Sequence, residues 1–369
     1  MKISVLGSTG VIGTLTLEIA ERNGIEVIGL AAGRNIESLR KQIEKFRPSY
    51  IAVEKEEDAR ILGKDVLWGE EGLIALATLS EADVVVIAVS GTAGILPTYE
   101  AVRAGKRVAL ANKESLVSGG RIIINELKHS DSVIIPVDSE HNSLFQLLQY
   151  PEKPEKVIIT ASGGPFFREK PENVTIKDVL SHPVWNMGKK ITVDSATLMN
   201  KAFEMVEAKW LFDLSPEQIG VLIHPQSIVH SIIKMRDGSL LAHMSLPDMR
   251  IPIQYALFYP ERKDSPAGSL DLSELETLEF YRADPEKYPA IGLGYRMLKS
   301  LPSLSAVING ANDQAVEYFL QGKIKFCSIL DVIIKVSKRH QPFTPSSIED
   351  VLGLVKEGKE RVKKIIGEL

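Results

Sequence analysis

The segment PVDSEHNSLFQ (136–146) brings two carboxylates close together in the chain. The run SVIIPV (132–137) has the composition of a buried strand, and Asp138 and Glu140 follow it at positions i and i+2. Residues at this spacing point to the same side of an extended chain, so two acids are expected side by side at the end of a strand. Like charges disfavour such an arrangement unless a positive charge offsets them. The segment therefore requires a compensating cation.

A second acidic element lies in DSATLMNKAFEMVEAKW (194–210), which predicts a capped helix. The candidate N-cap residues are Asp194, Ser195 and Thr197. Asn200 and Glu204 fall on one helix face, and Lys201 is three residues before Glu204. By spacing alone, the favoured interpretation is a Lys–Glu pair on the surface of an amphipathic helix.

A glycine-rich turn follows the first apolar run, KISVL (2–6). Gly7, Gly10 and Gly13 form the pattern G-x-x-G-x-x-G between that strand and a helical segment. Glycines in this context let the backbone approach a pyrophosphate, whose charge the helix N-terminus stabilises. The pattern predicts a dinucleotide site, although a tight turn without a ligand has the same signature.

The end of the second strand, IEVIGLAAG (25–33), distinguishes between the two nicotinamide cofactors. An NAD site usually has an acidic residue there for the ribose 2′-hydroxyl. This chain continues with Arg34 and Asn35, a cation and an amide, which favour the 2′-phosphate of NADP. The alternative for Arg34 is a solvated surface arginine, and Asn35 is also a plausible cap for the helix over 35–46.

Two polar loops complete the set of candidate functional segments. TASGGPF (160–166) supplies a hydroxyl and two glycines, and HPVWNMGKK (182–190) places a histidine, a tryptophan and a methionine beside two lysines. The second loop is interpreted as a lid over an anionic ligand. The alternative is an ordinary hydrophobic anchor beneath a loop.

The elements that must position these residues alternate in type along the first 149 residues. Six apolar runs separated by helical patterns predict a parallel, doubly wound α/β sheet of Rossmann-like form. The chain then changes character, and the motif RDG (236–238) between two apolar runs predicts a hairpin. The expected divisions are a dinucleotide-binding domain over 1–149, a catalytic α+β domain over 150–265, a linker over 266–290 and a helical C-terminal domain over 291–369.

Bulk composition excludes several classes of protein. The chain has 369 residues, of which 44% are hydrophobic and 25% charged, and its net charge of −4 gives no sign of a nucleic-acid surface. The single cysteine, Cys327, excludes an internal disulfide framework and is expected to be a buried small hydrophobe. The longest apolar run, VVVIAV (84–89), is too short to cross a membrane, and no signal peptide is recognisable. A soluble cytoplasmic protein is expected.

Taken together, these motifs resemble the 1-deoxy-D-xylulose-5-phosphate reductoisomerase family along essentially the whole chain. The segments that carry the resemblance are GSTGVIG (7–13), AGRN (32–35), ALANKESLV (109–117), PVDSEHN (136–142), ASGGPF (161–166), HPVWNMGKKITVDSATLMNK (182–201) and HPQS (224–227). The combination of VDSEHN and VDSATLMNK is highly specific for this family.

The resemblance implies NADPH, a divalent metal ion (Mg²⁺, Mn²⁺ or Co²⁺) and a phosphorylated ketose as ligands. Metal ligands would be Asp138, Glu140 and Glu204. Catalytic residues would be these three together with Lys113. Substrate contacts would be Lys113, Ser139, Glu140, Ser162, His182, Trp185, Ser195, Asn200, Lys201 and Glu204. Cofactor contacts would be Gly7, Thr9, Gly10, Val11, Ile12, Gly33, Arg34, Asn35, Asn112, Glu114 and Gly188. Trp185 and Met187 would form the apolar cover of a flap.

The implied reaction is a carbon–carbon rearrangement of 1-deoxy-D-xylulose 5-phosphate followed by reduction to 2-C-methyl-D-erythritol 4-phosphate. Three carboxylates form an oxygen-ligand site suited to Mg²⁺ or Mn²⁺, and the cation offsets their repulsion. His141 is interpreted as a hydrogen-bonded structural histidine. The chain departs from the family pattern at Val11, where serine is usual, and at Arg34, where lysine is common.

Two alternatives remain at this point. A plain NADP-dependent reductase of a phosphorylated aldehyde explains the glycine-rich turn and Arg34 but gives the three acids no role. A cofactor-sensing regulator predicts neither metal dependence nor turnover. Family members form homodimers, and an exposed sheet edge in the middle domain is the expected contact.

Overall fold

The computed structural model describes residues 1–63, 65–168, 174–181, 185 and 187–367. Its contacts divide the chain into two compact units. The first unit comprises residues 1–115, 123–142 and 248–268. The second comprises residues 116–122, 143–247 and 269–369.

A parallel sheet organises the first unit. In the described residues it has seven strands in the order β4-β3-β2-β1-β5-β6-β7. Their bounds are β1 (Lys2–Leu6), β2 (Glu26–Ala32), β3 (Tyr50–Val53), β4 (Leu67–Trp68), β5 (Val84–Ile87), β6 (Arg107–Leu110) and β7 (Val133–Pro136). Central strands are buried on both faces, which explains why β5 is a continuous apolar run. The strand order reverses at β1, the position where doubly wound sheets bind ligands.

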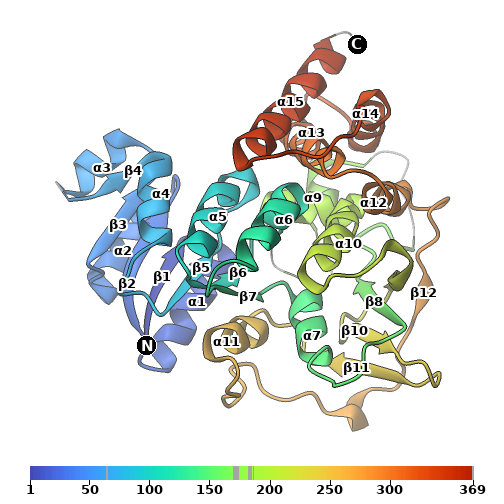
Figure 1. Cartoon of the computed structure of the whole chain (residues 1–369), viewed down its shortest axis with the longest axis horizontal. Helices are drawn as coiled ribbons and strands as arrows, with labels where there is room; N and C mark the ends of the chain where they lie inside the picture. Colours follow the sequence, from blue (N-terminus) through green and yellow to red (C-terminus); the bar gives the residue numbers. More distant parts are fainter. Residues whose placement is uncertain (64, 169–173, 182–184, 186, 368–369) are drawn as a thin grey trace. The chain divides into compact units, whose positions relative to one another are not determined.

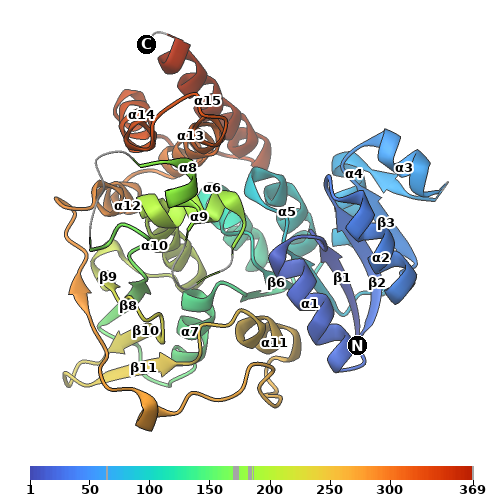
Figure 2. The same cartoon turned by 180° about the vertical axis from the view of Figure 1, so that it is seen from behind.

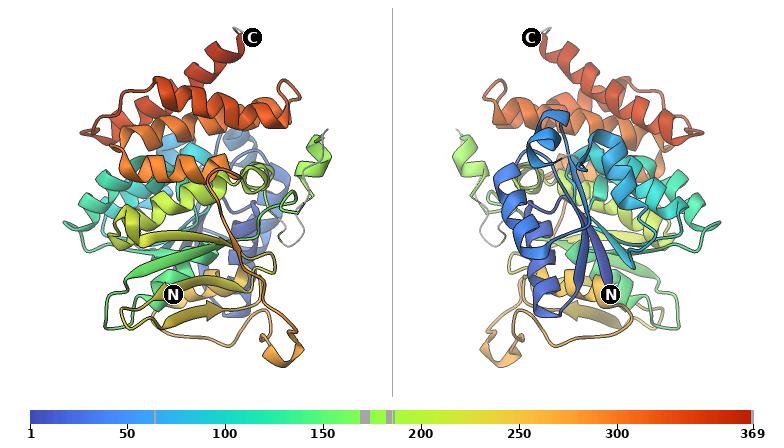
Figure 3. Two further views of the ribbon diagram at one scale, coloured as in Figure 1. Left: turned by 90° about the vertical axis from the view of Figure 1, so that its right-hand side faces the viewer. Right: turned by 90° about the vertical axis from the view of Figure 1, so that its left-hand side faces the viewer.

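Helices cover both faces of this sheet. The helices of this unit are α1 (Val11–Arg22), α2 (Ile36–Phe46), α3 (Glu56–Leu62), α4 (Gly69–Ala77), α5 (Ile95–Arg103) and α11 (Arg250–Phe258), with a short 3-10 helix η1 (Gly91–Gly94) before α5. Helices α6 (Lys113–Leu127) and α7 (Ser139–Leu147) belong partly to each unit. The right-hand view of Figure 3 shows α1 and α2, in dark blue, on one side of the strands and α4 and α5 on the other. The predicted doubly wound architecture is confirmed.

Two features of this unit escaped the sequence analysis. The chain between β3 and β5 holds the edge strand β4 and the helices α3 and α4, so the sheet has one strand more than expected. Helix α11 packs against α1, β6 and β7 although it follows the second sheet in the chain (Figure 1). The guanidinium group of Arg107 donates a 3.2 Å hydrogen bond to the carbonyl of Ala256, which anchors α11 at β6.

The second unit contains a mixed sheet. Among the described residues it has five strands in the order β11-β10-β8-β9-β12. Their bounds are β8 (Lys156–Ala161), β9 (Ile219–Ile223), β10 (Val229–Lys234), β11 (Leu240–Met244) and β12 (Tyr281–Arg282). β10 and β11 pair antiparallel across a turn in which Gly238 has a φ of 89°. This confirms the hairpin predicted from RDG.

Helices form the rest of the second unit. Their bounds are α8 (Ile176–Val179), α9 (Lys189–Thr197), α10 (Met199–Phe212), α12 (Pro289–Lys299), α13 (Ser303–Leu320), α14 (Phe326–Arg339) and α15 (Ile348–Gly367), with the 3-10 helices η2 (Pro216–Gln218) and η3 (Leu272–Glu274). α10 packs on β9 and α12, while α13 packs on α9, α14 and α15 (Figure 2). The expected helical C-terminus is confirmed, whereas the division into four predicted segments remains a prediction.

The expectation that Cys327 is buried is wrong, because its side chain is exposed. Helix α14 buries a stripe at Phe326, Ile329, Val332, Ile333 and Val336, and Cys327 lies off that stripe on the solvent face. Within the described residues, every helix is too short or too polar to span a lipid bilayer.

Candidate functional site

The glycine-rich turn lies at the carboxyl end of the central strand β1, in the first unit. Gly7 has a φ of 89°, and a Cβ atom there would come within 2.5 Å of the carbonyl oxygen of Ala88. A Cβ atom on Gly13 would come within 2.3 Å of the carbonyl oxygen of Gly7. Both positions therefore require glycine. Gly10 is the N-cap of α1, so the helix N-terminus presents backbone donors that suit a pyrophosphate.

Arg34 follows β2 and extends into solvent, with a side chain that is 87% exposed. Its Nε atom lies 3.5 Å from a carboxylate oxygen of Glu54, at the end of β3. The side chain of Asn35 accepts a 3.1 Å hydrogen bond from the backbone N–H of Ser38, which confirms its predicted role as the N-cap of α2. An exposed cation at this position fits recognition of a 2′-phosphate. Val11, in the glycine-rich turn, is 40% exposed.

Asn112 holds the junction between β6 and α6. Its side chain accepts a 3.0 Å hydrogen bond from the backbone N–H of Ser115 and donates to the carbonyl oxygens of Val89 (2.9 Å) and Gly91 (2.8 Å). Asn112 and Glu114 are both buried. Asn112 thus fixes the loop after β5 against the start of α6, and this positions the next residue, Lys113.

Lys113 pairs with Asp138, and both side chains are largely buried in the first unit. The Nδ1 atom of His141, which is fully buried, lies 4.0 Å from Asp138. Burial raises the pKa of Asp138, but the charge of Lys113 and the neighbouring His141 outweigh it and hold the pKa well below its ordinary value. Asp138 is therefore an ionised carboxylate, and a buried lysine already offsets its charge.

The backbone expected for Asp138 and Glu140 is wrong. Strand β7 ends at Pro136 and helix α7 begins at Ser139, so Glu140 lies in the first turn of a helix rather than in an extended chain. The positive end of the helix dipole favours an acid at this position. The hydroxyl of Ser139 donates a 2.6 Å hydrogen bond to the Glu140 carboxylate.

Glu204 lies on α10 in the second unit and is almost fully buried. Lys201 and Asn200 both donate hydrogen bonds to its carboxylate. Lys201 and Glu204 have side-chain exposures of 3% and 1%, so the predicted surface pair exists but is buried. Asp138, Glu140 and Glu204 each offer carboxylate oxygens, the ligand type that Mg²⁺ prefers in proteins.

The expected helix cap before α10 is also wrong. Asp194 and Ser195 lie inside a separate helix, α9, which ends at Thr197. Leu198 adopts a left-handed conformation with a φ of 61°, and this residue turns the chain into α10. A β-branched and polar sequence, VDSAT, weakly predicts a helix, which explains the error.

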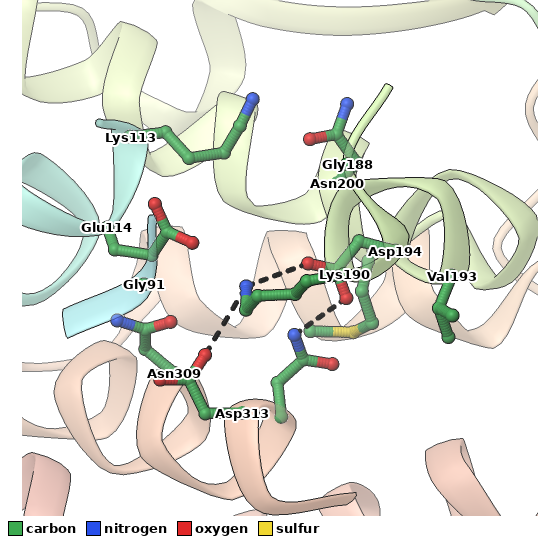
Figure 4. A network of polar contacts seen from close by, with 12 residues as sticks. Gly91, Lys113, Glu114, Gly188, Lys190, Val193, Asp194, Asn200, Asn309 and Asp313 are labelled. Carbon is green, nitrogen blue, oxygen red and sulfur yellow. Dashed lines mark hydrogen bonds and ion pairs between the residues drawn. The ribbon is translucent and has the colours of Figure 1, made fainter. Parts of the chain in front are cut away.

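A polar network fixes α9 within the second unit (Figure 4). The buried carboxylate of Asp194 receives hydrogen bonds from Lys190 (2.9 Å) and from the amide of Asn312 on α13 (2.8 Å). Lys190 also lies 3.3 Å from Asp313, which pairs with Lys359 on α15 at 3.5 Å. α9 begins directly after Gly188, so this network holds the end of the predicted flap. Local sequence does not reveal this network, because Asn312 lies more than a hundred residues further along the chain than Asp194.

The residues predicted at the phosphate end lie on α9, α10 and the turn after β8. A Cβ atom on Gly164 would come within 2.8 Å of the carbonyl oxygen of Ser195, so the ASGG turn that contains Ser162 packs against α9. Trp185 lies 6.4 Å, between ring centroids, from the buried His230 on β10. His230 had no role in the sequence analysis. His182 lies outside the described residues.

Three sequence profiles of one family match this chain. They are 1-deoxy-D-xylulose 5-phosphate reductoisomerase over residues 3–120, the C-terminal domain of that reductoisomerase over 134–212, and the DXP reductoisomerase C-terminal domain over 244–361. The 1-deoxy-D-xylulose 5-phosphate reductoisomerase of Geotalea uraniireducens is 47% identical over 380 residues, which cover 99% of this chain and 98% of the relative. That of Chlorobaculum tepidum is 44% identical over 379 residues, with 99% of both chains covered.

Solved structures match over the full length. A DOX-P reductoisomerase in complex with NADPH, fosmidomycin and magnesium has a TM-score of 0.94 at 35% identity, covering 100% of this chain and 98% of the other. The reductoisomerase of Zymomonas mobilis in complex with NADPH has a TM-score of 0.89 at 36% identity, covering 100% and 99% of the two chains.

Proposed function

The chain belongs to the 1-deoxy-D-xylulose 5-phosphate reductoisomerase family, and from that premise we propose that it converts 1-deoxy-D-xylulose 5-phosphate to 2-C-methyl-D-erythritol 4-phosphate with NADPH and a divalent metal ion. The observation that carries the proposal is similarity along the whole chain, at 47% identity to a relative of that name. The solved structure in complex with NADPH, fosmidomycin and magnesium supports the choice of cofactors.

The cofactor residues are assigned to the first unit and to the start of α9. The turn from Gly7 through Thr9, Gly10, Val11 and Ile12 receives the pyrophosphate, while Arg34 binds the 2′-phosphate beside Gly33 and Asn35. Asn112 and Glu114, both buried, are also assigned to the cofactor site. Gly188 is assigned to the cofactor site as well. When bound, NADPH supplies the hydride that reduces the rearranged aldehyde.

The metal ligands are assigned as Asp138, Glu140 and Glu204. When bound, the ion supplies Lewis-acid polarisation of the substrate's oxygens. Mg²⁺ is favoured because solved structures of related reductoisomerases are complexes with magnesium. Mn²⁺ and Co²⁺ are proposed as alternatives that the same oxygen donors accept.

The chain's own groups orient the substrate around that site. Lys113 presents an ammonium group that stabilises negative charge at the carbonyl end, and Ser139 donates a hydrogen bond there. Ser162, His182, Ser195, Asn200 and Lys201 hold the phosphate, and this remote grip provides binding energy for orientation. Trp185 and Met187 cover the substrate and exclude water while the two carbon fragments rejoin.

An NADPH-oxidation assay tests the proposal against its alternatives. The purified protein is mixed with NADPH and 1-deoxy-D-xylulose 5-phosphate, with Mg²⁺, Mn²⁺, Co²⁺ or EDTA, and the product is identified by mass spectrometry. We expect metal-dependent oxidation and the branched product. Oxidation that persists in EDTA would indicate a plain reductase, and cofactor binding without turnover would indicate a sensor.

We further propose that two copies of the chain associate through the edge of the second sheet. Strand β11 is at the end of the strand order, and Leu240 on it is 60% exposed. An exposed apolar edge strand is a template for pairing with another chain. Light scattering coupled to size-exclusion chromatography should give twice the chain mass of 40.7 kDa. A cytoplasmic location remains a prediction from the sequence.

A further inference from the structure

Each of two proposed metal ligands is paired with a lysine of its own unit. Asp138 pairs with Lys113, at side-chain exposures of 12% and 8%. Glu204 pairs with Lys201, at exposures of 1% and 3%. The two pairs lie in different units and on different elements, so they are independent observations. In each pair, the ammonium group contacts one oxygen of a carboxylate that is proposed to bind the metal ion.

A divalent ion that binds these oxygens must displace the ammonium groups or share the oxygens with them. Sharing is unfavourable, because it places a dication and a monocation within a few ångströms of each other at a buried site. A lysine has a flexible stem, so its ammonium group can swing away while its backbone stays in place. Each lysine is therefore a competitor of the metal for one carboxylate.

A displaced ammonium group that remains buried without a counter-ion carries a heavy desolvation cost. An anion that arrives with or after the metal relieves that cost. On a small organic phosphate, the groups that can pair with the ammonium group are the phosphate itself and any oxygen that gains negative charge.

We propose that Lys113 and Lys201 are exchangeable counter-ions: they neutralise Asp138 and Glu204 in the metal-free protein, and metal binding releases them to bind the anionic groups of the ligand. This inference rests on the proposed function, because it takes Asp138 and Glu204 as metal ligands. Its consequence is positive coupling between metal and anion. By linkage, each must raise the affinity for the other by the same factor.

The first experiment measures Mn²⁺ binding alone, by the loss of the free-ion electron paramagnetic resonance signal, in the full-length protein. Lys201→Gln removes the competing charge and should bind Mn²⁺ about tenfold more tightly, or better, which corresponds to about 1.4 kcal/mol. Lys201→Arg keeps the charge and should stay within about threefold of the wild type. Unchanged or weaker Mn²⁺ binding in folded Lys201→Gln would overturn the proposal.

Two further variants provide a control for the change in charge and a second test if Lys201→Gln does not fold. Lys363 pairs with Glu360 at the same i, i+3 separation on α15, where the two side chains are 46% and 58% exposed. Lys363→Gln should leave Mn²⁺ affinity unchanged, which controls for the loss of one positive charge from the protein. If Lys201→Gln does not fold, as judged by circular dichroism, Lys113→Gln provides the same test at Asp138 and should also tighten binding.

The second experiment measures coupling with inorganic phosphate as the probe. Calorimetric titration of phosphate, corrected for the metal–phosphate complex in solution, should give an affinity at least about fivefold higher with saturating Mg²⁺ than with EDTA. In Lys201→Gln the ratio should fall towards one. Independent binding of metal and phosphate to the wild type would refute the exchange.

Failure of the counter-ion exchange can be distinguished experimentally from failure of the proposed function. Turnover of 1-deoxy-D-xylulose 5-phosphate with no metal–phosphate coupling would preserve the function and reject the exchange. Coupling without turnover would reject the function and preserve the exchange.

Discussion

Helices α13 and α15 cross at two glycines, and this crossing makes a quantitative prediction about the second unit. A Cβ atom on Gly358 would lie 2.1 Å from the carbonyl oxygen of Val307, and one on Gly310 would lie 2.0 Å from that of Val355. Both obstacles are backbone atoms, which cannot rotate away as a side chain does. Gly358→Ala must therefore push the two helices apart by roughly 1 Å to reach ordinary contact distances.

The expected change in the free energy of unfolding of Gly358→Ala follows from two opposing effects. Overpacking of this kind costs about 3 kcal/mol, the upper part of the usual range, because neither backbone can yield. Replacing a helical glycine by alanine returns about 1 kcal/mol through helix propensity. We expect Gly358→Ala to lower the free energy of unfolding of the second unit by about 2 kcal/mol.

The same helix supplies the control. Gly353 is exposed on α15, and a Cβ atom there meets nothing within 4 Å. Gly353→Ala should raise stability by about 0.5–1 kcal/mol, so the two variants should differ by roughly 3 kcal/mol.

Urea unfolding followed by circular dichroism, together with hydrogen exchange of the α13 amides, measures this difference. α13 carries Asn312 and Asp313, which bind Asp194 and Lys190 on α9, so faster exchange should extend into α9 in Gly358→Ala only. Equal stability of the two alanine variants would refute the close helix crossing and the reasoning built on it.

Three further predictions concern the site itself. Glu204→Gln should abolish metal-supported turnover while the NADPH dissociation constant stays within about twofold of the wild type, as measured by fluorescence titration; retained turnover would remove Glu204 from the metal site. Arg34→Ala should weaken NADPH binding at least about tenfold and NADH binding less than about twofold, because only NADPH has the 2′-phosphate; equal losses would refute that contact. Asp138 has a pKa held well below its unfolded value of 3.8, so its ionised form stabilises the fold above that pH and the contribution is lost as the pH falls through the folded pKa. The stability difference between wild type and Asp138→Asn should therefore be constant near neutral pH and shrink below about pH 4, as measured by urea unfolding across pH; a difference that grows on acidification would contradict the Lys113 pairing.

Local signals in the sequence predicted much of the scaffold, because each depends on a few neighbouring residues. The cap at Asn35 and the hairpin around Gly238 both appear where the pattern places them. The turn at Gly7 also appears as expected, since its positive φ and its contact with Ala88 leave no alternative to glycine. These features required no knowledge of distant segments.

The predictions from sequence are wrong where the local backbone depends on packing between distant segments. Nothing near VDSAT signals that Asn312 will hold Asp194, so the helical state of α9 could not be read from its weak propensity. The start of α7 directly after β7 likewise changed the expected arrangement of Asp138 and Glu140. In both cases the residue types were recognised while the backbone that presents them was not.

The two Lys–Glu pairs at a separation of three residues show why spacing alone could not reveal the site. Lys363 and Glu360 on α15 remain in solvent, where such a pair contributes little to stability. Lys201 and Glu204 on α10 have the same separation but are buried, because α10 packs against β9 and α12. Burial turns a marginal surface pair into one in which neither charge can be left alone without a large cost. The tertiary packing around α10, rather than the local sequence, is therefore what makes Lys201 a competitor of a cation for Glu204.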